Sequence, residues 1–250
     1  MALQLAIVTY APRDNPDKLS VDLVGAVHIA DRSYYEALNA RFQEYDALLY
    51  ELVVQEGAPL PKESTQGTGF LSSAQLMLGN FLDLSFQLDE IDYSAANFVH
   101  ADLSPQELKQ SMIDRDESLY VYFWRMYFAA MKDYTNDPYG IDSMTAMLVS
   151  GQGFNLKIAF AYELAELEKV GDFLGGESGS AVISARNERA LETLRLQLAL
   201  GRKRVGIFYG AAHLPDMEQR LLHGFGFTHR KTVWIDAWQL RDSGGNSPVK

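Results

Sequence analysis

Short apolar segments alternate with helical segments at both ends of this 250-residue chain, and this alternation restricts the fold more than any other feature. In the first third, residues 3–10, 20–29 and 47–54 are apolar runs of the length of buried strands. Between the last two, residues 33–45 begin with a Ser-x-x-Glu capping box and carry apolar residues at helical spacing. A strand, a helix and a strand in this order predict parallel strands with the helix on one face of the sheet.

The last third of the chain shows the same alternation. Residues 180–200 have an amphipathic pattern that ends at Gly201, where a helix stop is expected. Its apolar stripe consists of Ile183, Ala190, Leu191, Leu194 and Leu198. A predicted strand at 204–212, a helix at 215–222 and a strand at 232–238 follow. Both ends of the chain therefore predict an α/β arrangement.

The middle of the chain differs, because residues 70–169 have almost entirely helical periodicity. Ser104 is the predicted N-cap of one of these helices, with proline at the first helical position and glutamate at the third. We predict an α/β fold with a central mixed, largely parallel sheet flanked by helices, and a large helical insertion at about 70–170. Residues 1–242 form one predicted domain, and the polar tail 243–250 is expected to be disordered.

The charge and the absence of cysteine exclude several classes of function. Asp and Glu number 33 against 22 Lys and Arg, and the formal net charge of -11 would repel a nucleic-acid backbone. Without cysteine the chain has no disulfide, thiolate metal site or cysteine nucleophile. A bound metal ion would need His, Asp, Glu or backbone oxygen as ligands. The longest apolar stretch is far shorter than the roughly 20 residues of a membrane-spanning helix.

One short pattern occurs twice, each time at the end of a predicted strand. Gly25-Ala-Val-His28 and Gly210-Ala-Ala-His213 share glycine, alanine and histidine in register, with an aspartate three residues further on. Open α/β sheets bind ligands at the carboxyl ends of their strands, and glycine permits a close backbone approach there. Each histidine also precedes a predicted helix, whose positive end favours the neutral ring. Neutral imidazole binds metal ions or accepts protons; a structural hydrogen bond at a strand end is the alternative.

Glu51 is the third candidate, because it lies within the apolar strand pattern of residues 47–54. A buried carboxylate without a partner costs several kcal/mol, so this side chain needs a metal ion, an arginine or a histidine beside it. The alternative is an ion pair with a purely structural role.

Arg186 and Asn187 form the fourth element. Asn187 falls on the apolar stripe of its helix, so its amide is predicted to face the interior, and the Arg186 guanidinium is suited to a carboxylate or a developing oxyanion. A surface or packing role is the alternative for both residues. His100 and Asp102 lie just before Ser104, at a helix entrance from which they could reach the site, but local turn hydrogen bonds explain them more simply.

Taken in order, these motifs resemble the TraB/PrgY/GumN/TIKI family, which belongs to a wider superfamily with the erythromycin esterases and the ChaN haem-binding proteins. The resemblance rests on the two Gly-x-x-His motifs, the strand glutamate and the late Arg-Asn pair, and covers about residues 22–54 and 180–238. It implies a metal-dependent peptidase that relies on His28, His213 and Glu51.

These residues predict a metal-dependent hydrolase of peptide or related amide bonds. A divalent ion such as Mn²⁺, Co²⁺ or Zn²⁺ would lower the pKa of bound water and polarise the scissile carbonyl. Glu51 would be a ligand or the general base, Arg186 and Asn187 would hold the substrate, and Gly25 and Gly210 would let the backbone approach the ligand. The alternatives are a non-catalytic protein that binds a peptide or haem, and a metal-free esterase in which a histidine activates water.

The predicted partner is a peptide or small-molecule substrate, with no nucleic acid and no membrane-spanning segment. Aromatic and methionine residues are concentrated in the helical middle, which suits core packing, a peptide cleft or a homodimer interface. They are Met112, Tyr120, Tyr122, Phe123, Trp124, Met126, Tyr127, Phe128, Met131, Met144 and Met147. The sequence leaves the compartment open: a soluble, cytoplasmic protein is expected from the chain as it stands, or an exported one if a signal peptide has been removed.

Overall fold

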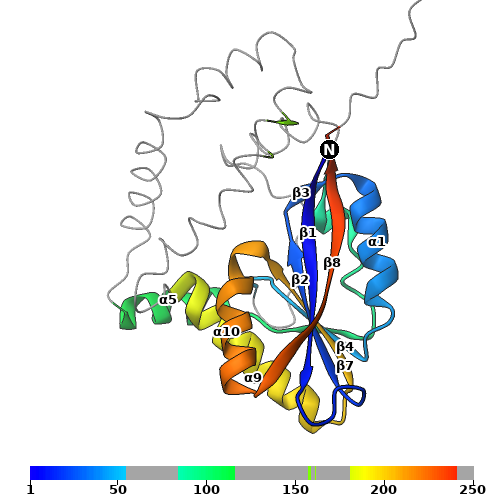
Figure 1. The fold of residues 1–250 in the computed structure, drawn as a ribbon. Coiled ribbons are helices and arrows are strands. Elements are labelled where there is room, and N and C mark those ends of the chain that lie inside the picture. The colour runs from blue at the N-terminus through cyan, green and yellow to red at the C-terminus, as the bar shows by residue number, and fades with distance from the viewer. Residues whose placement is uncertain (55–83, 116–156, 159–160, 162–180, 241–250) are drawn as a thin grey trace, which may run out of the picture.

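Six strands form one mixed sheet in the order β6-β4-β7-β2-β1-β8 (Figure 1). The computed structural model describes residues 1–54, 84–115, 157–158, 161 and 181–240. The strands are β1 (Ala2–Pro12), β2 (Ser20–Ala26), β4 (Ala47–Tyr50), β6 (Phe98–His100), β7 (Arg204–Gly210) and β8 (Phe227–Gln239). Neighbours among β6, β4, β7 and β2 pair in parallel, whereas β1 pairs antiparallel with both β2 and β8. The prediction of a mixed α/β sheet is therefore confirmed.

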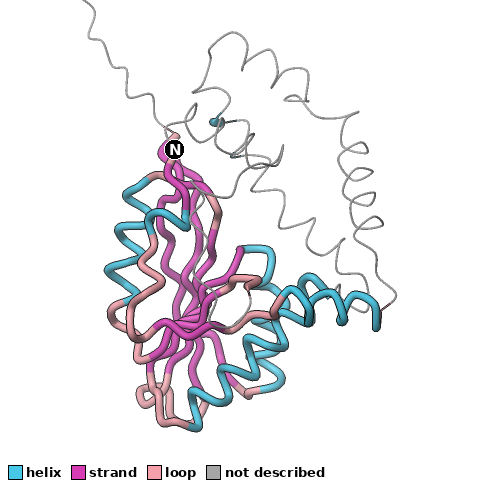
Figure 2. Tube along the Cα trace, turned by 180° about the vertical axis from the view of Figure 1, so that it is seen from behind, coloured by secondary structure: helices cyan, strands magenta, loops and turns pink. Residues whose placement is uncertain are grey.

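Helices cover both faces of this sheet, which gives three layers (Figures 1 and 2). Helix α1 (Arg32–Phe42) packs on one face, and α9 (Arg186–Ala199) and α10 (Leu214–Gly224) pack on the other. The shorter elements are α4 (Gln87–Glu90), α5 (Pro105–Asp114), a π-helical turn at Ala181–Ala185, a 3₁₀ turn at Ala211–His213, and the strand pair β3 (Ile29–Ala30) and β5 (Ser85–Phe86).

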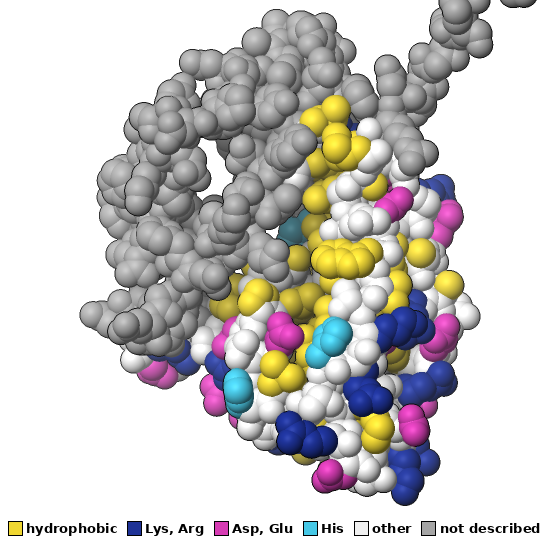
Figure 3. Space-filling model, viewed as in Figure 1, with side chains coloured by type: hydrophobic (Ala, Val, Ile, Leu, Met, Phe, Trp, Pro, Cys, Tyr) yellow, Lys and Arg dark blue, Asp and Glu magenta, His cyan; other side chains and the backbone are white. Residues whose placement is uncertain are grey.

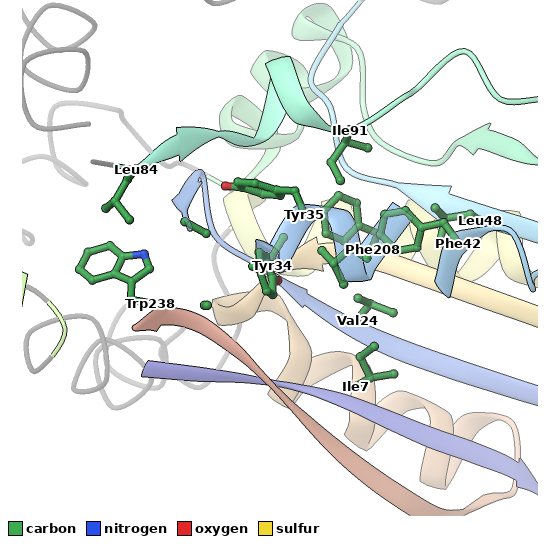
Figure 4. Close-up of a cluster of buried hydrophobic side chains, with 14 of the residues drawn as sticks. Ile7, Val24, Tyr34, Tyr35, Phe42, Leu48, Leu84, Ile91, Phe208 and Trp238 are labelled. Carbon is green, nitrogen blue, oxygen red and sulfur yellow. The ribbon is translucent and has the colours of Figure 1, made fainter. Parts of the chain in front are cut away.

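The core is divided in two by the sheet, because successive residues of a strand point to opposite faces. On β2, Val24 packs in the cluster beneath α1, whereas its neighbour Leu23 packs in the cluster beneath α9 and α10. Figure 4 shows the first cluster, in which Phe42 of α1 meets Leu48 and Phe208 from two parallel strands. Strands buried on both faces explain why the central segments read as continuous apolar runs instead of alternating ones.

The predicted strand-helix-strand unit of the first third is present, but its two strands are not neighbours. Strands β2 and β4 both run parallel to β7, which lies between them. A strand contributed by the last third of the chain is thus inserted into a unit from the first third. This insertion places the ends of β2, β7 and β4 side by side, and these strands lead into His28, His213 and Glu51.

The helix starts agree with the sequence at one position and differ at another. Ser104 caps α5 with the predicted reciprocal capping box: its side chain accepts from the Glu107 N–H, and the Glu107 carboxylate accepts from the Ser104 N–H. Helix α1 instead begins at Arg32, with Asp31 at the N-cap and no side-chain cap. The Asp31 carboxylate binds Lys157 at 2.7 Å and the Gln239 N–H of β8, so it ties the loop to the sheet edge.

Most of the predicted helical insertion lies outside the described residues, as do the tail 243–250 and the aromatic segment from Tyr120 to Met147. Within the described part, α4 and α5 are helical as predicted. Residues 98–100, however, form β6, which joins the central sheet beside β4, so this region is not entirely helical. Three residues were too few to give a strand signal against the surrounding helical periodicity.

Strand β8 is an edge of the sheet and is exposed along residues 229–234, where Trp234 is 60% exposed. On the face of the molecule seen in Figure 3, hydrophobic side chains lie along the upper part and Lys and Arg side chains gather in the lower part. Arg230 and Lys231 lie on the exposed stretch, and basic residues on an edge strand disfavour pairing with a second sheet. Of the helices in the described ranges, none combines the length and the apolar character needed to cross a bilayer.

Candidate functional site

The parallel strands bring the sequence candidates together at one edge of the sheet. Tyr50 of β4 pairs with Phe208 of β7, and Ala26 of β2 pairs with Gly210, so the three strands end at nearly the same level. Glu51 directly follows β4, and its N–H donates to the Phe208 carbonyl at 3.1 Å. The two Gly-x-x-His motifs therefore leave adjacent strands, with Glu51 on the far side of β7.

The two carboxylate oxygens of Glu51 are held by two different donors, a backbone N–H and a guanidinium group. Its Oε2 accepts from the Gly210 N–H at 2.5 Å, and its Oε1 lies 2.7 Å from an Arg186 guanidinium nitrogen. A Cβ at position 210 would stand 3.2 Å from Oε2, which is tighter than ordinary contact. Glycine at this position therefore lets the carboxylate reach the backbone of the motif. A Cβ at Gly25 would meet its neighbours at 3.4 Å or more, so the first motif has no such requirement.

Arg186 stands between two carboxylates. Its Nε and one terminal nitrogen bind Asp102 at 2.9 Å and 2.6 Å, and the same terminal nitrogen reaches Glu51. The Asp102 side chain is fully buried and that of Arg186 is 10% exposed. Asp102 and Glu51 outweigh the effect of burial and raise the pKa of Arg186 above its ordinary value. The guanidinium is therefore a fixed positive charge beside Glu51.

Asn187 fixes the hydrogen position on His213. Its Nδ2 faces two oxygens, the His213 carbonyl at 3.1 Å and Asp216 Oδ2 at 2.8 Å, so this nitrogen is the donor. Its Oδ1, 2.6 Å from His213 Nδ1, must then accept, which places the ring hydrogen on Nδ1. In the neutral ring the Nε2 lone pair is left free. This nitrogen lies 3.7 Å from Glu51 Oε1.

The charges around Glu51 favour its ionised form. Burial alone would raise the pKa of Glu51. Four neighbouring groups outweigh burial and hold this pKa below its ordinary value: the His213 ring when it is protonated, the Arg186 guanidinium, the Gly210 N–H and the His28 ring when it is protonated. The carboxylate is therefore charged at neutral pH and available as a ligand or a base.

His213 should make the stability of the metal-free protein depend on pH. The residue is 4% exposed, and burial lowers the pKa of its ring below the ordinary 6.5, against the attraction of Glu51. Between the lowered pKa and 6.5 the unfolded chain binds more protons than the folded chain, so the free energy of unfolding rises with pH in this window. We expect that free energy, measured by urea denaturation with chelator present, to fall as the pH is lowered from 6.5, and His213→Gln to flatten the slope.

The matched control for this measurement is His223→Gln, an exposed histidine on α10. It should keep the slope of the unmodified protein. An unchanged slope in His213→Gln would assign the pH dependence to other groups.

His28 has a different environment from His213, although the two motifs are alike in sequence. It is exposed, and it lines a pocket of about 250 Å³ together with Glu51, Arg186 and Gly210. Its carbonyl accepts from the Gln87 N–H at 2.9 Å, which fixes the loop after β2 against α4. Glu51 lines this pocket with the exposed His28, and its Oε1 lies 3.7 Å from Nε2 of the buried His213. It therefore lies between the two histidines.

Within the described ranges, no three His, Asp or Glu side chains are grouped closely enough to form a metal site. His213 Nε2 and Glu51 Oε1 form a pair 3.7 Å apart. No family model, curated protein or solved structure matches this chain. What the site can do chemically follows from its own residues.

Two members of the site were not among the sequence candidates. Asp102 does cap its own turn, since Oδ1 accepts from the Leu103 N–H at 2.7 Å, but both of its oxygens also bind Arg186. Its only sequence signal was its position just before a capped helix. Gln87 also lines the pocket and had no signal at all, because it enters through the short elements β5 and α4.

Proposed function

We propose that this protein is a metal-dependent hydrolase of amide bonds, as its resemblance to the TraB/PrgY/GumN/TIKI family implies. The observation that carries the proposal is the orientation of His213, whose free Nε2 faces the ionised Glu51 Oε1 at 3.7 Å. Two lone pairs that face each other in a buried site repel unless a positive group lies between them. The separation is too long for a direct hydrogen bond.

Two of the residues present would suit a divalent ion as ligands, although the described residues contain no complete group of three. Metal-to-nitrogen and metal-to-oxygen bonds of about 2.0–2.2 Å allow two ligand atoms at such a separation to share one ion. His213 and Glu51 would hold it, with Asn187 fixing the ring from behind, as groups outside the first ligands commonly do. A third ligand would have to come from His28, which is exposed on the same pocket but is not grouped closely enough with the other two in this structure. When bound, Mn²⁺, Co²⁺ or Zn²⁺ supplies a low pKa for coordinated water and polarises a carbonyl.

The other residues would position the substrate. Arg186 lines the pocket and carries a fixed positive charge, which suits a carbonyl oxygen that becomes negative during hydrolysis. Asp102 holds the guanidinium plane through two hydrogen bonds, so the charge is oriented before the substrate arrives. Gly25 is not among the residues that line the pocket, and its carbonyl accepts from the buried Tyr34 hydroxyl at 2.6 Å.

A second candidate is a metal-free hydrolase, and one contact favours it. Arg186 lies 2.7 Å from Glu51 Oε1 and already supplies the positive charge that this carboxylate needs. In this case His28, which is exposed on the pocket, would accept the proton of the attacking water. Haem binding is the remaining alternative, and a Soret band on adding haem to the purified protein would favour it.

Chelation separates the two hydrolases. Purified protein is treated with chelator, reloaded separately with Mn²⁺, Co²⁺ or Zn²⁺, and tested for cleavage of a peptide library. We expect cleavage to be lost with chelator and restored by at least one ion, because the ion activates the water. His213→Gln should lose both bound metal and cleavage, whereas the exposed His223→Gln on α10 should lose neither.

Each other outcome has a definite meaning. Cleavage that survives chelation and is lost in His28→Gln would replace the metal-dependent hydrolase by the metal-free one. The absence of cleavage under all loading conditions would overturn hydrolysis.

A further inference from the structure

Gln87 contains a buried oxygen without a partner. The residue begins α4 and is 7% exposed. Its backbone N–H donates to the His28 carbonyl at 2.9 Å, and its Nε2 donates to the Tyr93 hydroxyl at 2.7 Å. Among the buried side-chain nitrogen and oxygen atoms of the described residues, Gln87 Oε1 is the one without a hydrogen bond.

Such an atom is unusual in a folded protein. Buried polar groups are nearly always paired, because an unpaired acceptor loses its hydrogen bonds to water and gains nothing in return. Two donors of Gln87 are used: the backbone N–H holds the residue against the loop of His28, and the Nε2 bond to Tyr93 holds the side-chain amide. Since no described residue supplies a donor to it, this oxygen is a preformed acceptor that a ligand N–H would complete.

The place where that donor would come from is the pocket of the candidate site. Gln87 lines it together with Glu51, Arg186 and His28. The pocket therefore offers acceptors at Gln87 and Glu51 and a positive donor at Arg186. An amide group matches this set, because it has both an N–H donor and a carbonyl acceptor. An ester of the same shape has the carbonyl but no donor.

We propose that Gln87 determines specificity by accepting the N–H of an amide-bearing ligand, and so selects amides over esters. This inference rests on the proposed function, since it takes the same pocket as the substrate site and names its substrate class. A site built to bind a donor rejects an analogue without one, because its acceptor then stays buried and unpaired.

The test measures binding, and does not depend on turnover. N-acetylalanine methylamide and N-acetylalanine methyl ester are titrated separately into the full chain, with chelator present, and followed by isothermal titration calorimetry and by NMR. We expect the amide to bind about tenfold more tightly than the ester, the ratio typical of one hydrogen bond. Gln87→Met removes the acceptor at similar volume and should bind both probes with equal affinity.

Three comparisons make the result specific. Gln87→Glu keeps an acceptor oxygen and should keep the amide preference, and Gln219→Met, an exposed position on α10, should behave as the unmodified protein. The melting temperature of Gln87→Met should stay close to that of the unmodified protein, because the substitution removes an unpaired buried oxygen as well as the hydrogen bond to the Tyr93 hydroxyl. Cleavage assays on the same samples test the hydrolase separately, so its failure leaves the amide preference standing.

Several outcomes would overturn the inference. These are equal binding of the two probes by the unmodified protein, no binding of either probe, an amide preference that persists in Gln87→Met, or its loss in Gln87→Glu.

Discussion

Glu51→Gln is expected to reduce cleavage by about 10²–10⁴-fold, the range over which a positioned acid or base contributes to a reaction. The glutamine oxygen accepts from one of the two donors, the Gly210 N–H or Arg186, and its NH2 group then faces the other, so only one of these hydrogen bonds is kept. What is lost is the negative charge that faces His213 Nε2. Bound metal should fall with activity, because a neutral amide is a weaker ligand than a carboxylate. Cleavage rate and metal content of the same preparation measure both effects.

The control for this substitution is Glu36→Gln, an exposed glutamate on α1. It removes the same charge from the whole protein and should leave cleavage and metal content unchanged. Activity within a few fold of normal in Glu51→Gln would show that the carboxylate is part of a structural ion pair, the alternative that its sequence context leaves open.

Arg186→Leu is expected to lower the free energy of unfolding by about 3–5 kcal/mol, the cost of leaving one partner of a buried ion pair without the other. The Asp102 side chain is fully buried and would lose both of its guanidinium bonds. The double variant Arg186→Leu/Asp102→Leu should be more stable than Arg186→Leu alone, because it removes the unpaired charge as well. Urea denaturation of the four proteins of this cycle gives each free energy.

The same helix provides the matched control. Arg189 lies three residues further along α9 and binds Glu107 at 2.7 Å. Both side chains are more than one-third exposed, Arg189 at 35% and Glu107 at 46%. Exposed pairs contribute roughly 0.2–1 kcal/mol, so Arg189→Leu should cost no more than about 1 kcal/mol. Equal costs for the two arginine variants would contradict the view that burial makes the Arg186 pair different.

Local patterns in the sequence identified the elements that carry the site. The capping box at Ser104, the helix stop at Gly201 and the apolar stripe of α9 are each determined within a few residues, because they depend on local hydrogen bonds and on helical periodicity. Gly201 has the positive φ, 84°, that a helix stop of this kind requires. The polar Asn187 on that stripe is buried, and its partner is a histidine from another element.

Other features depended on contacts between distant parts of the chain. The two histidine motifs are nearly identical in sequence, yet His213 is buried beside Asn187 and His28 is exposed on the pocket. The residues that follow each motif decide this difference: α10 follows His213 directly, whereas a short strand paired with β5 follows His28. Pairing between segments more than fifty residues apart leaves no periodic signal in either of them.

The sequence by itself determined the longer strands and helices of the described residues, and which candidate polar residues stand at their ends, because these depend on side-chain periodicity and nearby backbone bonds. Only the tertiary structure decided that β7 lies between β2 and β4, and with it that Glu51, Arg186 and His213 meet. It also brought in Asp102 and Gln87, whose partners are distant in the chain. Strand order depends on burying both faces of the sheet at the same time, and residues from distant parts of the chain contribute to both faces.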